Sequence, residues 1–473
     1  MRWLRYWRLG TCLLGCISGL PVLGRTNALT SHRPNVVLIV ADDLGWGDLG
    51  CYGQRNIRTP VLDRMAQEGM RFTDHYAGHT VCAPSRCALM LGLHTGHCPV
   101  RGNREVQPMG QQPIPDEAFT LAELFKQAGY TTALIGKWGL GGPGSSGEPN
   151  RQGFDYFFGY LCQRHAHNYF PEFLFRNHQR VVLRNLLAEP KRPDGAGVAI
   201  RRLDYAPDLM LKEALAFIRR NRARPFFLYF ATTLPHANNE AGDRGMEIPD
   251  YGIYRDLPWP EPQKGHAAMI TRLDQDVGRI LDQLERLGLS DRTLVLFTSD
   301  NGPHREGGND PEFNDSNGPF RGIKRDLYEG GIRVPLIARW PGRIPKGVVS
   351  DHVCAFWDYL PTFAELLGVA LPVDVDGISF LPTLLGDPSR QRQHAFLYWE
   401  FHERPATVQA IRMGKWKAVR HSPSGPVELY DLSTDPGESR DLAGQHPEVV
   451  EKIREYLRTA RTDHPLWPLR EGQ

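Results

Sequence analysis

The sequence predicts an α/β fold in which helices flank a mostly parallel sheet, with a smaller C-terminal region of short strands and one helix. Two observations support this prediction. Up to residue 297, short apolar runs alternate with longer segments of helical periodicity. After residue 385 the pattern changes to short strands separated by turns. With 473 residues, 41% of them hydrophobic, the chain is long enough for a large domain, expected at 33–385, and a smaller one at 386–473.

Four continuous apolar runs, rich in β-branched and aromatic residues, are typical of buried parallel strands. They cover residues 36–40, 131–135, 226–230 and 294–297. Helical patterns lie between them, at 60–68, 120–127, 208–221 and 266–287. The C-terminal region predicts strands at 396–401, 408–413, 416–420 and 427–432, and then a helix at 447–461.

The first 28 residues read as a signal peptide. An apolar run at about 9–23 follows three arginines, Arg2, Arg5 and Arg8. Because a stable membrane span needs about 20 apolar residues, the run predicts export rather than a membrane anchor. Lipoprotein anchoring at Cys16 is the alternative, and we favour a soluble periplasmic or secreted protein.

Charge and cysteine content narrow the function classes. The net charge is +2 and the sequence contains no basic run, so nothing indicates nucleic-acid or membrane-surface binding. Eight cysteines are present, two of them in the N-terminal segment. We expect one disulfide or none, because an odd number remains if Cys82 is modified.

Polar residues follow each of the four predicted strands, at the point where the strand ends. They are Asp42-Asp43, Lys137-Trp138, Leu234-Pro235-His236 and Asp300-Asn301. Open α/β sheets bind ligands at the carboxyl ends of their strands. A single strand-end residue is uninformative, but four converging sets predict a functional site.

The acids and the amide of this set predict a metal site. Asp42, Asp43, Asp300 and Asn301 offer only oxygen ligands and three negative charges, which suits a hard divalent cation. Ca²⁺ is our first choice and Mg²⁺ the second, and clustered cysteines or histidines for zinc are missing from the pattern. The alternative is that each pair is only a turn former.

The run from Cys82 to Arg86 predicts the start of a helix. Pro84 suits a first helical turn, which places Cys82 at the N-terminus, where free backbone amides favour an anion. Arg86 falls on the same helix face and can direct its guanidinium to the same anion. The alternative is a buried free cysteine beside a surface arginine.

The run Cys82-Ala83-Pro84-Ser85-Arg86, followed by Leu89, Gly92 and Leu93-His94-Thr95-Gly96, resembles the signature of the type I, formylglycine-dependent sulfatases. The resemblance extends from about residue 33 to the end. It is of the arylsulfatase or N-acetylgalactosamine-sulfatase type, within the alkaline phosphatase superfamily. It implies a large mixed, mostly parallel, alkaline-phosphatase-like sheet and a small C-terminal antiparallel sheet with a helix. It also implies that a maturation enzyme oxidises Cys82 to formylglycine, whose hydrate attacks sulfate esters, and that the four metal-site residues hold calcium beside residue 82.

The resemblance assigns further catalytic roles. Lys137 matches a catalytic lysine, His236 a histidine near the leaving-group oxygen, and Lys324 a lysine that contacts sulfate. The family usually reads Lys-Trp-His-Leu-Gly, and its histidine contacts the hydrate, whereas this chain has Gly139 in that position. His79 and His304 are candidate replacements, or Lys137 acts alone.

Substrate recognition is expected from loops between the core elements. His165, His167 and Asn168 could hydrogen-bond sugar hydroxyls, and His304 is a further substrate-binding candidate. The resemblance implies sulfated glycans, with galactose or N-acetylgalactosamine sulfates as the first choice. The alternatives are a phosphonate or phosphodiester hydrolase of the same superfamily and a non-catalytic glycan-binding relative, which Gly139 would suit.

Overall fold

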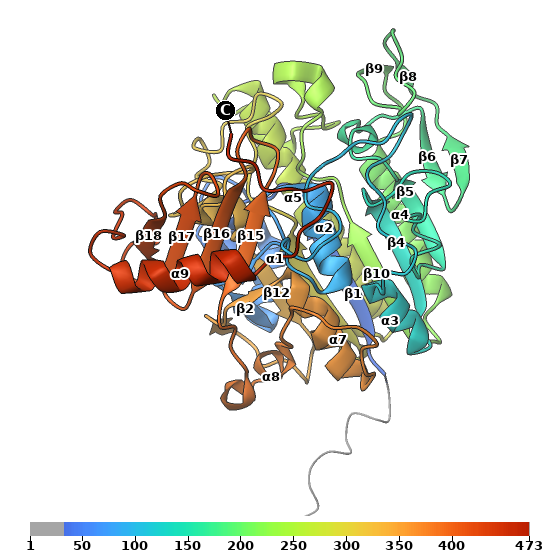
Figure 1. Cartoon of the computed structure of the whole chain (residues 1–473). Coiled ribbons are helices and arrows are strands. Elements are labelled where there is room, and N and C mark those ends of the chain that lie inside the picture. Colours follow the sequence, from blue (N-terminus) through green and yellow to red (C-terminus); the bar gives the residue numbers. More distant parts are fainter. Residues whose placement is uncertain (1–32, 473) are drawn as a thin grey trace, which may run out of the picture. The chain divides into compact units, whose positions relative to one another are not determined.

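A mixed sheet of ten strands forms the centre of the computed structural model, which describes residues 33–472. The strand order is β13-β2-β12-β11-β1-β10-β4-β5-β6-β7 (Figure 1). The predicted signal peptide and Cys16 lie outside the described residues. The predicted α/β class with a large mixed sheet is confirmed.

Five adjacent parallel strands make up the middle of this sheet. They are β11 (Thr293–Ser299), β1 (Asn35–Ala41), β10 (Phe226–Ala231), β4 (Thr131–Lys137) and β5 (Tyr156–Tyr160). Val36 of β1 pairs with Phe227 on one side and Leu294 on the other. All seven residues of β1 are buried, as a strand covered on both faces requires. The four strands predicted from apolar runs are all present.

The outer strands make the sheet mixed. Beyond β11 lie β12 (Leu336–Arg339), β2 (Met70–Phe72) and β13 (Val348–Ser350), and beyond β5 lie β6 (Phe173–Arg176) and β7 (Gln179–Val182). The β11–β12, β12–β2, β5–β6 and β6–β7 pairs are antiparallel. Two small ladders pair β3 (His75–Tyr76) with β14 (Cys354–Ala355) and β8 (Leu186–Leu187) with β9 (Ala199–Arg201).

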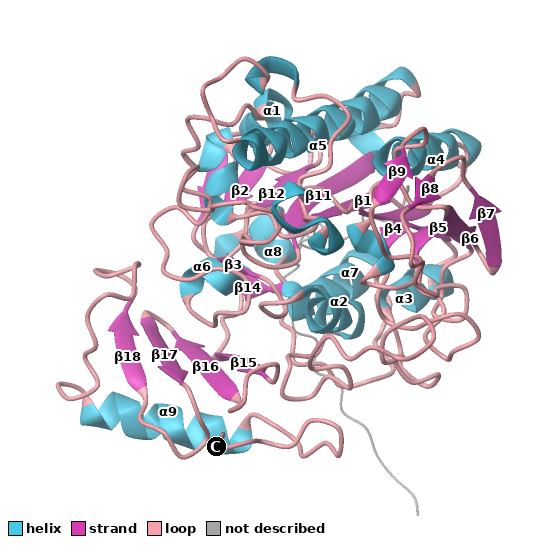
Figure 2. Ribbon diagram, turned by 90° about the horizontal axis from the view of Figure 1, so that it is seen from above, coloured by secondary structure: helices cyan, strands magenta, loops and turns pink. Residues whose placement is uncertain are grey.

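Helices cover both faces of the sheet (Figure 2). On one face pack α1 (Pro60–Glu68), α4 (Ala206–Arg220) and α5 (Glu261–Arg286). On the other pack α2 (Cys82–Leu91), α3 (Leu121–Gln127), α7 (Tyr359–Leu367) and α8 (Leu381–Leu384). A short helix, α6 (Glu329–Ile332), precedes β12. The predicted start of α5 at 266 was five residues late, because Pro262 is tolerated in the first turn.

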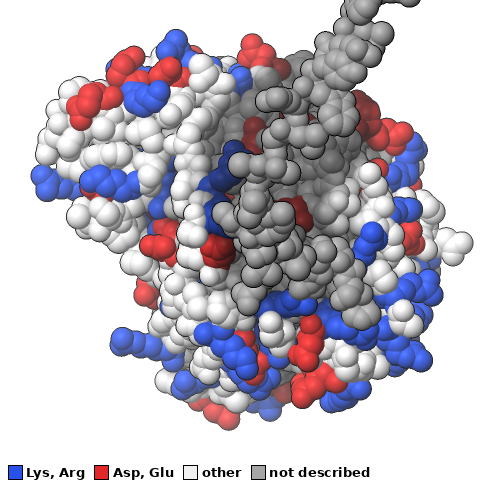
Figure 3. All heavy atoms as spheres, turned by 90° about the horizontal axis from the view of Figure 1, so that it is seen from below, with Lys and Arg blue, Asp and Glu red and all other residues white. Residues whose placement is uncertain are grey.

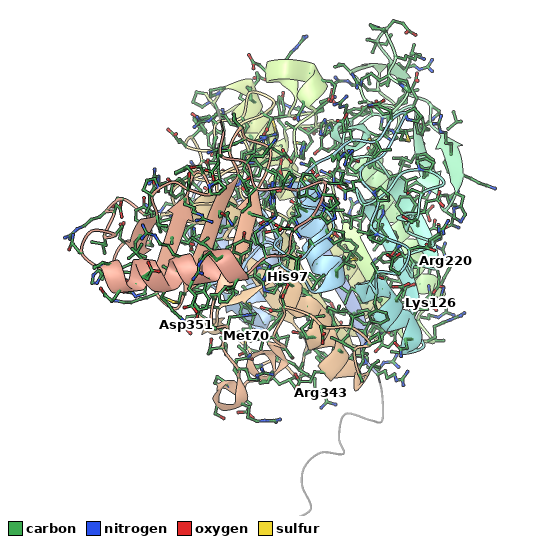
Figure 4. The ribbon with its side chains drawn as sticks, viewed as in Figure 1. Met70, His97, Lys126, Arg220, Arg343 and Asp351 are labelled. Atoms are coloured by element: carbon green, nitrogen blue, oxygen red, sulfur yellow. The ribbon has the colours of Figure 1, made fainter. Side chains whose placement is uncertain are left out.

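The helices run back across the sheet, so their ends mark its two edges. Lys126 lies near the C-terminal end of α3 and Arg220 at that of α4, and both are labelled at the right of Figure 4. Each helix is soon followed by a parallel strand, β4 and β10 respectively. The amino ends of the strands therefore lie at this edge, and their carboxyl ends lie at the opposite one.

A four-stranded antiparallel sheet follows, as predicted. It comprises β15 (Leu397–Phe401), β16 (Val408–Met413), β17 (Trp416–Arg420) and β18 (Glu428–Asp431). The amphipathic helix α9 (Pro447–Thr459) packs on it through Val450, Ile453 and Leu457. The described residues from 34 onward form one compact unit by their contacts, so the boundary at 385/386 stays a prediction.

Buried ion pairs join this small sheet to helix α6 and to the segment after β18. The Lys417 Nζ of β17 lies 3.2 Å from Glu329 Oε1 of α6 and 3.0 Å from Glu438 Oε1. All three side chains are fully buried. Removing one partner of such a group leaves an uncompensated buried charge, so these contacts hold the small sheet in a fixed position.

Three further properties concern the surface and the thiols. No helix within residues 33–472 has the length and apolar character needed to cross a membrane. On the face shown in Figure 3, basic and acidic side chains are interspersed among neutral ones. The six cysteines of the described region are all free thiols, within the expected limit of one disulfide or none.

Candidate active site

Four parallel strands bring their polar residues together at the carboxyl edge of the sheet. Asp42 and Asp43 follow β1, Lys137 ends β4, and His236 and Asp300 follow β10 and β11. Asp42, Asp43, His236 and Cys82 each offer a ligand atom, and these atoms all lie within 4.8 Å of one another. The convergence predicted from the strand ends is therefore present.

Cys82 is the first residue of α2, as predicted, with Pro84 in the first turn. Its Sγ lies 3.5 Å from Asp42 Oδ1 and 4.0 Å from Asp43 Oδ1. Burial raises the pKa of the Cys82 thiol well above its ordinary value, although Lys137 acts in the opposite direction. Since the thiolate is the nucleophilic form of cysteine, the unmodified side chain is a poor nucleophile at neutral pH.

Each acid of the site lies against at least one cationic side chain. Lys137 Nζ lies 2.7 Å from Asp42 Oδ2, Lys324 Nζ 2.7 Å from Asp43 Oδ2, and Arg86 Nη2 2.7 Å from Asp300 Oδ2. Three carboxyl groups thus meet three positive side chains in a buried space. These pairs explain how acids can remain charged there.

The pKa values of the acids follow from burial and from these neighbours. Burial alone would raise the pKa of Asp42 and Asp43, but Lys137 holds that of Asp42 well below its usual range. Lys324 lowers the pKa of Asp43 to about 2. Burial and the adjacent Asp42 raise the pKa of Asp300 to about 7. Asp42 and Asp43 therefore carry most of the negative charge at neutral pH.

Arg86 is directed at an acid and at the backbone rather than at an open anion position. Its Nε and Nη2 donate to Asp300 Oδ2 at 3.0 and 2.7 Å, and its Nη1 donates to the Lys137 carbonyl at 2.6 Å. The side chain is completely buried. Arg86 thus fixes Asp300 and the end of β4, which differs from the direct anion contact expected from helix spacing alone.

The oxygen ligands fit a divalent cation. Asn301 Nδ2 donates to Asp43 Oδ1 at 2.7 Å and to the Gly302 carbonyl at 2.9 Å. Asn301 Oδ1 is buried and has no hydrogen-bond partner among the described residues. An unpaired buried oxygen beside three carboxylates is the donor that a hard cation requires. The donor atoms present therefore fit a hard cation, and the choice of Asp42, Asp43, Asp300 and Asn301 as its ligands stays a prediction.

His236 lies between a backbone carbonyl and Lys324. Its Nδ1 donates to the Ala237 carbonyl at 2.6 Å, and its Nε2 lies 3.1 Å from Lys324 Nζ. Burial and the nearby ammonium group of Lys324 lower the pKa of His236 well below its usual value. The ring is therefore neutral, and Nε2 accepts a hydrogen bond from Lys324.

Of the three loop residues expected to bind sugar, only His167 lies beside the active-site residues. Its ring stacks on His236 with 4.8 Å between centroids, and its Nδ1 lies 3.1 Å from Glu240 Oε2. His165 is fully buried against Tyr160 and Phe173. Asn168 is also buried, and its Oδ1 accepts from the Phe170 amide at 2.9 Å. Both side chains support the loop rather than face a substrate.

Neither candidate for the missing histidine has a free ring nitrogen. His79 Nε2 contacts the Glu400 carbonyl at 2.9 Å, and its Nδ1 accepts from the Val81 amide at 3.1 Å. His304 Nε2 lies 3.2 Å from the Pro235 carbonyl, and its Nδ1 accepts from the Glu306 amide at 3.1 Å. His304 nevertheless lies beside the site, with its ring centroid 5.9 Å from that of His236.

Sequence reasoning missed two acids that lie beside His167 and His304. Glu240 contacts His167, and Glu306 Oε2 lies 3.4 Å from His304 Nδ1 while its other oxygen pairs with Arg325. Glu240 lies in a short 3-10 helix (Asn239–Arg244) and Glu306 in a loop, and no periodic pattern or strand end marks either of them in the sequence. Only their distances in the fold reveal their roles.

Comparison with known proteins decides the family. Residues 34–369, most of the chain, match the family model described as Sulfatase. The chain belongs to the sulfatase family. In this sulfatase, residues 321–463 also match the model described as N-sulphoglucosamine sulphohydrolase, C-terminal. The chain is accordingly a sulfuric ester hydrolase, and membership implies a divalent metal and formylglycine.

Individual relatives cover nearly the whole sulfatase. Arylsulfatase A of Homo sapiens is 36% identical over 94% of this chain and 89% of its own length. N-acetylgalactosamine-6-O-sulfatase of Bacteroides thetaiotaomicron is 31% identical over 93% of this chain and 95% of its own. The structure of Ps i-CgsB in complex with k-i-k-neocarrahexaose superposes with a TM-score of 0.76 at 28% identity, covering 93% and 95% of the two chains.

Proposed function

We propose that this sulfatase removes sulfate from sulfated glycans, with Cys82 converted to formylglycine and Ca²⁺ held by Asp42, Asp43, Asp300 and Asn301. One observation carries the proposal: Cys82 Sγ lies within 4.0 Å of two of these acids, yet its thiol is kept protonated by burial. Such a position is suited to a reacting group but not to an unmodified cysteine. Galactose or N-acetylgalactosamine sulfate is the substrate we infer first, and the named Bacteroides relative supports it.

The group at residue 82 and the cation would supply the reactive chemistry. A hydrated aldehyde offers one hydroxyl for attack on sulfur and a second whose deprotonation releases sulfate, while a divalent cation stabilises negative oxygen. The protein's own contribution is the charged environment. Lys137 and Lys324 lie against Asp42 and Asp43, next to residue 82, where a sulfate monoester would bring its negative charge.

Lys324 and His236 would serve the leaving group. Lys324 Nζ contacts Asp43 Oδ2 and His236 Nε2, so one ammonium joins the acid cluster to the histidine. A proton held between these two nitrogens can be passed to the departing alcohol oxygen. His167 lies on the outer side of His236, and we assign it, with Glu240, to contacts with the sugar.

Burial of Cys82 bears on maturation and export. The residue is 3% exposed and sits inside a helix whose ten residues are all buried. An enzyme could reach this thiol only in an unfolded chain, so we expect a formylglycine-generating partner to act before folding. The N-terminal targeting pattern agrees with export to the periplasm or the outside of the cell.

A substrate screen tests the proposal. We expect kcat/KM for sulfate monoesters of galactose or N-acetylgalactosamine to exceed that for phosphodiesters and phosphonates. A marked preference for phosphodiesters would favour a phosphonate or phosphodiester hydrolase of the same superfamily. Tight glycan binding without turnover, in protein whose residue 82 is an aldehyde, would favour a non-catalytic relative.

A further inference from the structure

The ends of β4 and β5 continue side by side beyond the sheet. The Trp138 amide donates to the Tyr160 carbonyl at 2.9 Å, and the Gly139 amide donates to the Leu161 carbonyl at 3.2 Å. These two bonds tie the segment after β5 to the residues that directly follow Lys137. Gln163 belongs to that segment, and it is 6% exposed.

The Gln163 carboxamide fills the space in which a side chain on residue 139 would start. A Cβ atom added to Gly139 would lie 1.9 Å from Gln163 Nε2 and 2.7 Å from its Cδ. Gly139 also has a φ of +82°, a conformation that disfavours other residues. Gly139 and Gln163 are therefore a matched pair, and a larger residue at 139 would displace the amide.

Both polar atoms of this carboxamide are buried without a partner. Nε2 and Oε1 of Gln163 make no hydrogen bond within residues 33–472, whereas its backbone amide is held by Gln111 Oε1 at 2.7 Å. Burying an amide unpaired is costly, so a group that completes the site should pair with it.

A neighbouring loop connects Gln163 to the start of α2. Gln111, which holds Gln163, forms an antiparallel bridge with Glu105. Two residues before Glu105, Asn103 Oδ1 accepts from the Ala83 amide at 3.0 Å. One loop thus contacts both Gln163 and the residue after Cys82. Lys137, two residues before Gly139, contacts Asp42, which in turn contacts Cys82.

We propose that the Gln163 carboxamide hydrogen-bonds the hydrated residue 82, in the place where the family motif carries a histidine at position 139. The inference rests on the proposed formylglycine at that residue. Oε1 accepts from a hydroxyl, and Nε2 donates to the second hydroxyl or to a sulfate oxygen. A carboxamide takes no proton at neutral pH, so Gln163 orients these groups and leaves proton transfer to others.

Gln163→Met tests this role, because methionine keeps the length and removes both polar atoms. We expect normal aldehyde formation by peptide mass and an unchanged or higher Tm, since an unpaired buried amide is lost. The kcat for sulfate esters should fall by about 10²-fold, the cost of removing one preorganised donor. The aldehyde should also react faster with a hydrazine label, because its hydrate loses a stabilising contact.

Gln152→Met is the matched control. Gln152 is also buried, but its Nε2 donates to the Ser146 carbonyl at 2.9 Å and to the Pro115 carbonyl at 3.3 Å. This variant should lose Tm and keep both the kcat per aldehyde and the labelling rate. The inference is overturned if Gln163→Met forms aldehyde and shows the kcat and labelling rate of the unmodified sequence.

A second variant decides the matter if Gln163→Met does not fold. Gln163→Glu keeps the shape and the acceptor oxygen but adds a negative charge, so KM for a sulfate ester should rise while labelling changes little. Unchanged KM and kcat in this variant would also overturn the inference. A starting protein that carries no aldehyde at residue 82 would instead count against the proposed function itself.

Discussion

Lys324 Nζ lies 3.1 Å from His236 Nε2, and both side chains are almost completely buried. The Nδ1 of His236 donates to the Ala237 carbonyl, which fixes the tautomer and leaves the lone pair of Nε2 facing the ammonium. The histidine is therefore neutral and shares a proton that Lys324 carries. We propose that this pair supplies the proton to the departing alcohol.

Replacement of His236 by alanine should affect substrates according to their leaving groups. A sugar alcohol is a poor leaving group and needs a proton, whereas a nitrophenolate does not. We expect kcat/KM for a sugar sulfate to fall by about 10²- to 10⁴-fold, the usual contribution of general acid catalysis, and that for nitrophenyl sulfate to fall much less. Steady-state kinetics on both substrates measure this. Equal losses would assign His236 to substrate binding alone.

Cys82→Ser should complete at most one turnover. A serine offers a single hydroxyl, so it has no second hydroxyl to expel sulfate once the S–O bond has formed. We expect either no reaction or a stable sulfate adduct, seen as the added mass of one SO₃ group on the peptide that contains residue 82. Cys82→Ala is the control without adduct. Full turnover by Cys82→Ser would contradict the aldehyde mechanism.

Calcium should stabilise the protein through Asn301. A ligand that binds only the folded state raises stability by about 2.7 kcal/mol at a concentration 100 times its Kd. We expect Tm to rise with calcium, and Asn301→Leu to abolish that rise because it removes the unpaired Oδ1. Asp376→Asn is the control. Asp376 lies with His94 and His97 in a second group of possible ligands, where it already contacts His97 Nδ1 at 2.9 Å. If only Asp376→Asn abolished the rise in Tm with calcium, the cation would be assigned to the group of Asp376, His94 and His97 instead.

Glu400 should make stability depend on acid pH. Burial alone would raise its pKa, but His402, Arg101 and Arg461 contact the carboxylate at 3.0, 2.7 and 2.9 Å and lower the pKa from 4.5 to about 2. Because the pKa is lower in the folded state, the charged carboxylate adds about 3 kcal/mol to the free energy of unfolding. This contribution is complete above pH 4.5 and is lost as the pH falls toward 2.

Urea unfolding of Glu400→Gln at several pH values checks this. The difference in unfolding free energy from the original protein should shrink as the pH falls from 4.5 toward 2. Glu455→Gln, which removes an exposed pair with Lys452, should show no comparable change. A constant difference across this range would mean that Glu400 acts through packing rather than through its charge.

The sequence predicted those features of the site that depend on local patterns along the chain. Asp42, Lys137 and Asp300 each follow a continuous apolar strand, and parallel strands bring their carboxyl ends to one edge, so convergence follows from topology. Cys82 at the start of α2 follows from Pro84 and the residues after it. These features depend on neighbours along the chain and on one general rule of sheet geometry.

The sequence could not predict which groups each side chain contacts, because these contacts depend on packing between segments that are distant along the chain. Arg86 has the spacing to face an anion, but Asp300, 214 residues away, takes its guanidinium. His165 sits in a polar loop, yet it is buried against Phe173. Gln163 has no local signal at all, since its position over Gly139 arises from the pairing of β4 with β5.

The oxidation state of residue 82 is the measurement that tests the account most directly. Peptide mass analysis after co-expression with a formylglycine-generating enzyme gives the aldehyde fraction of each preparation, and turnover of a sulfate ester is measured on the same sample. We predict that kcat rises in proportion to the aldehyde fraction and extrapolates to zero in protein that retains the Cys82 thiol. Full turnover by preparations in which residue 82 remains cysteine would contradict the account.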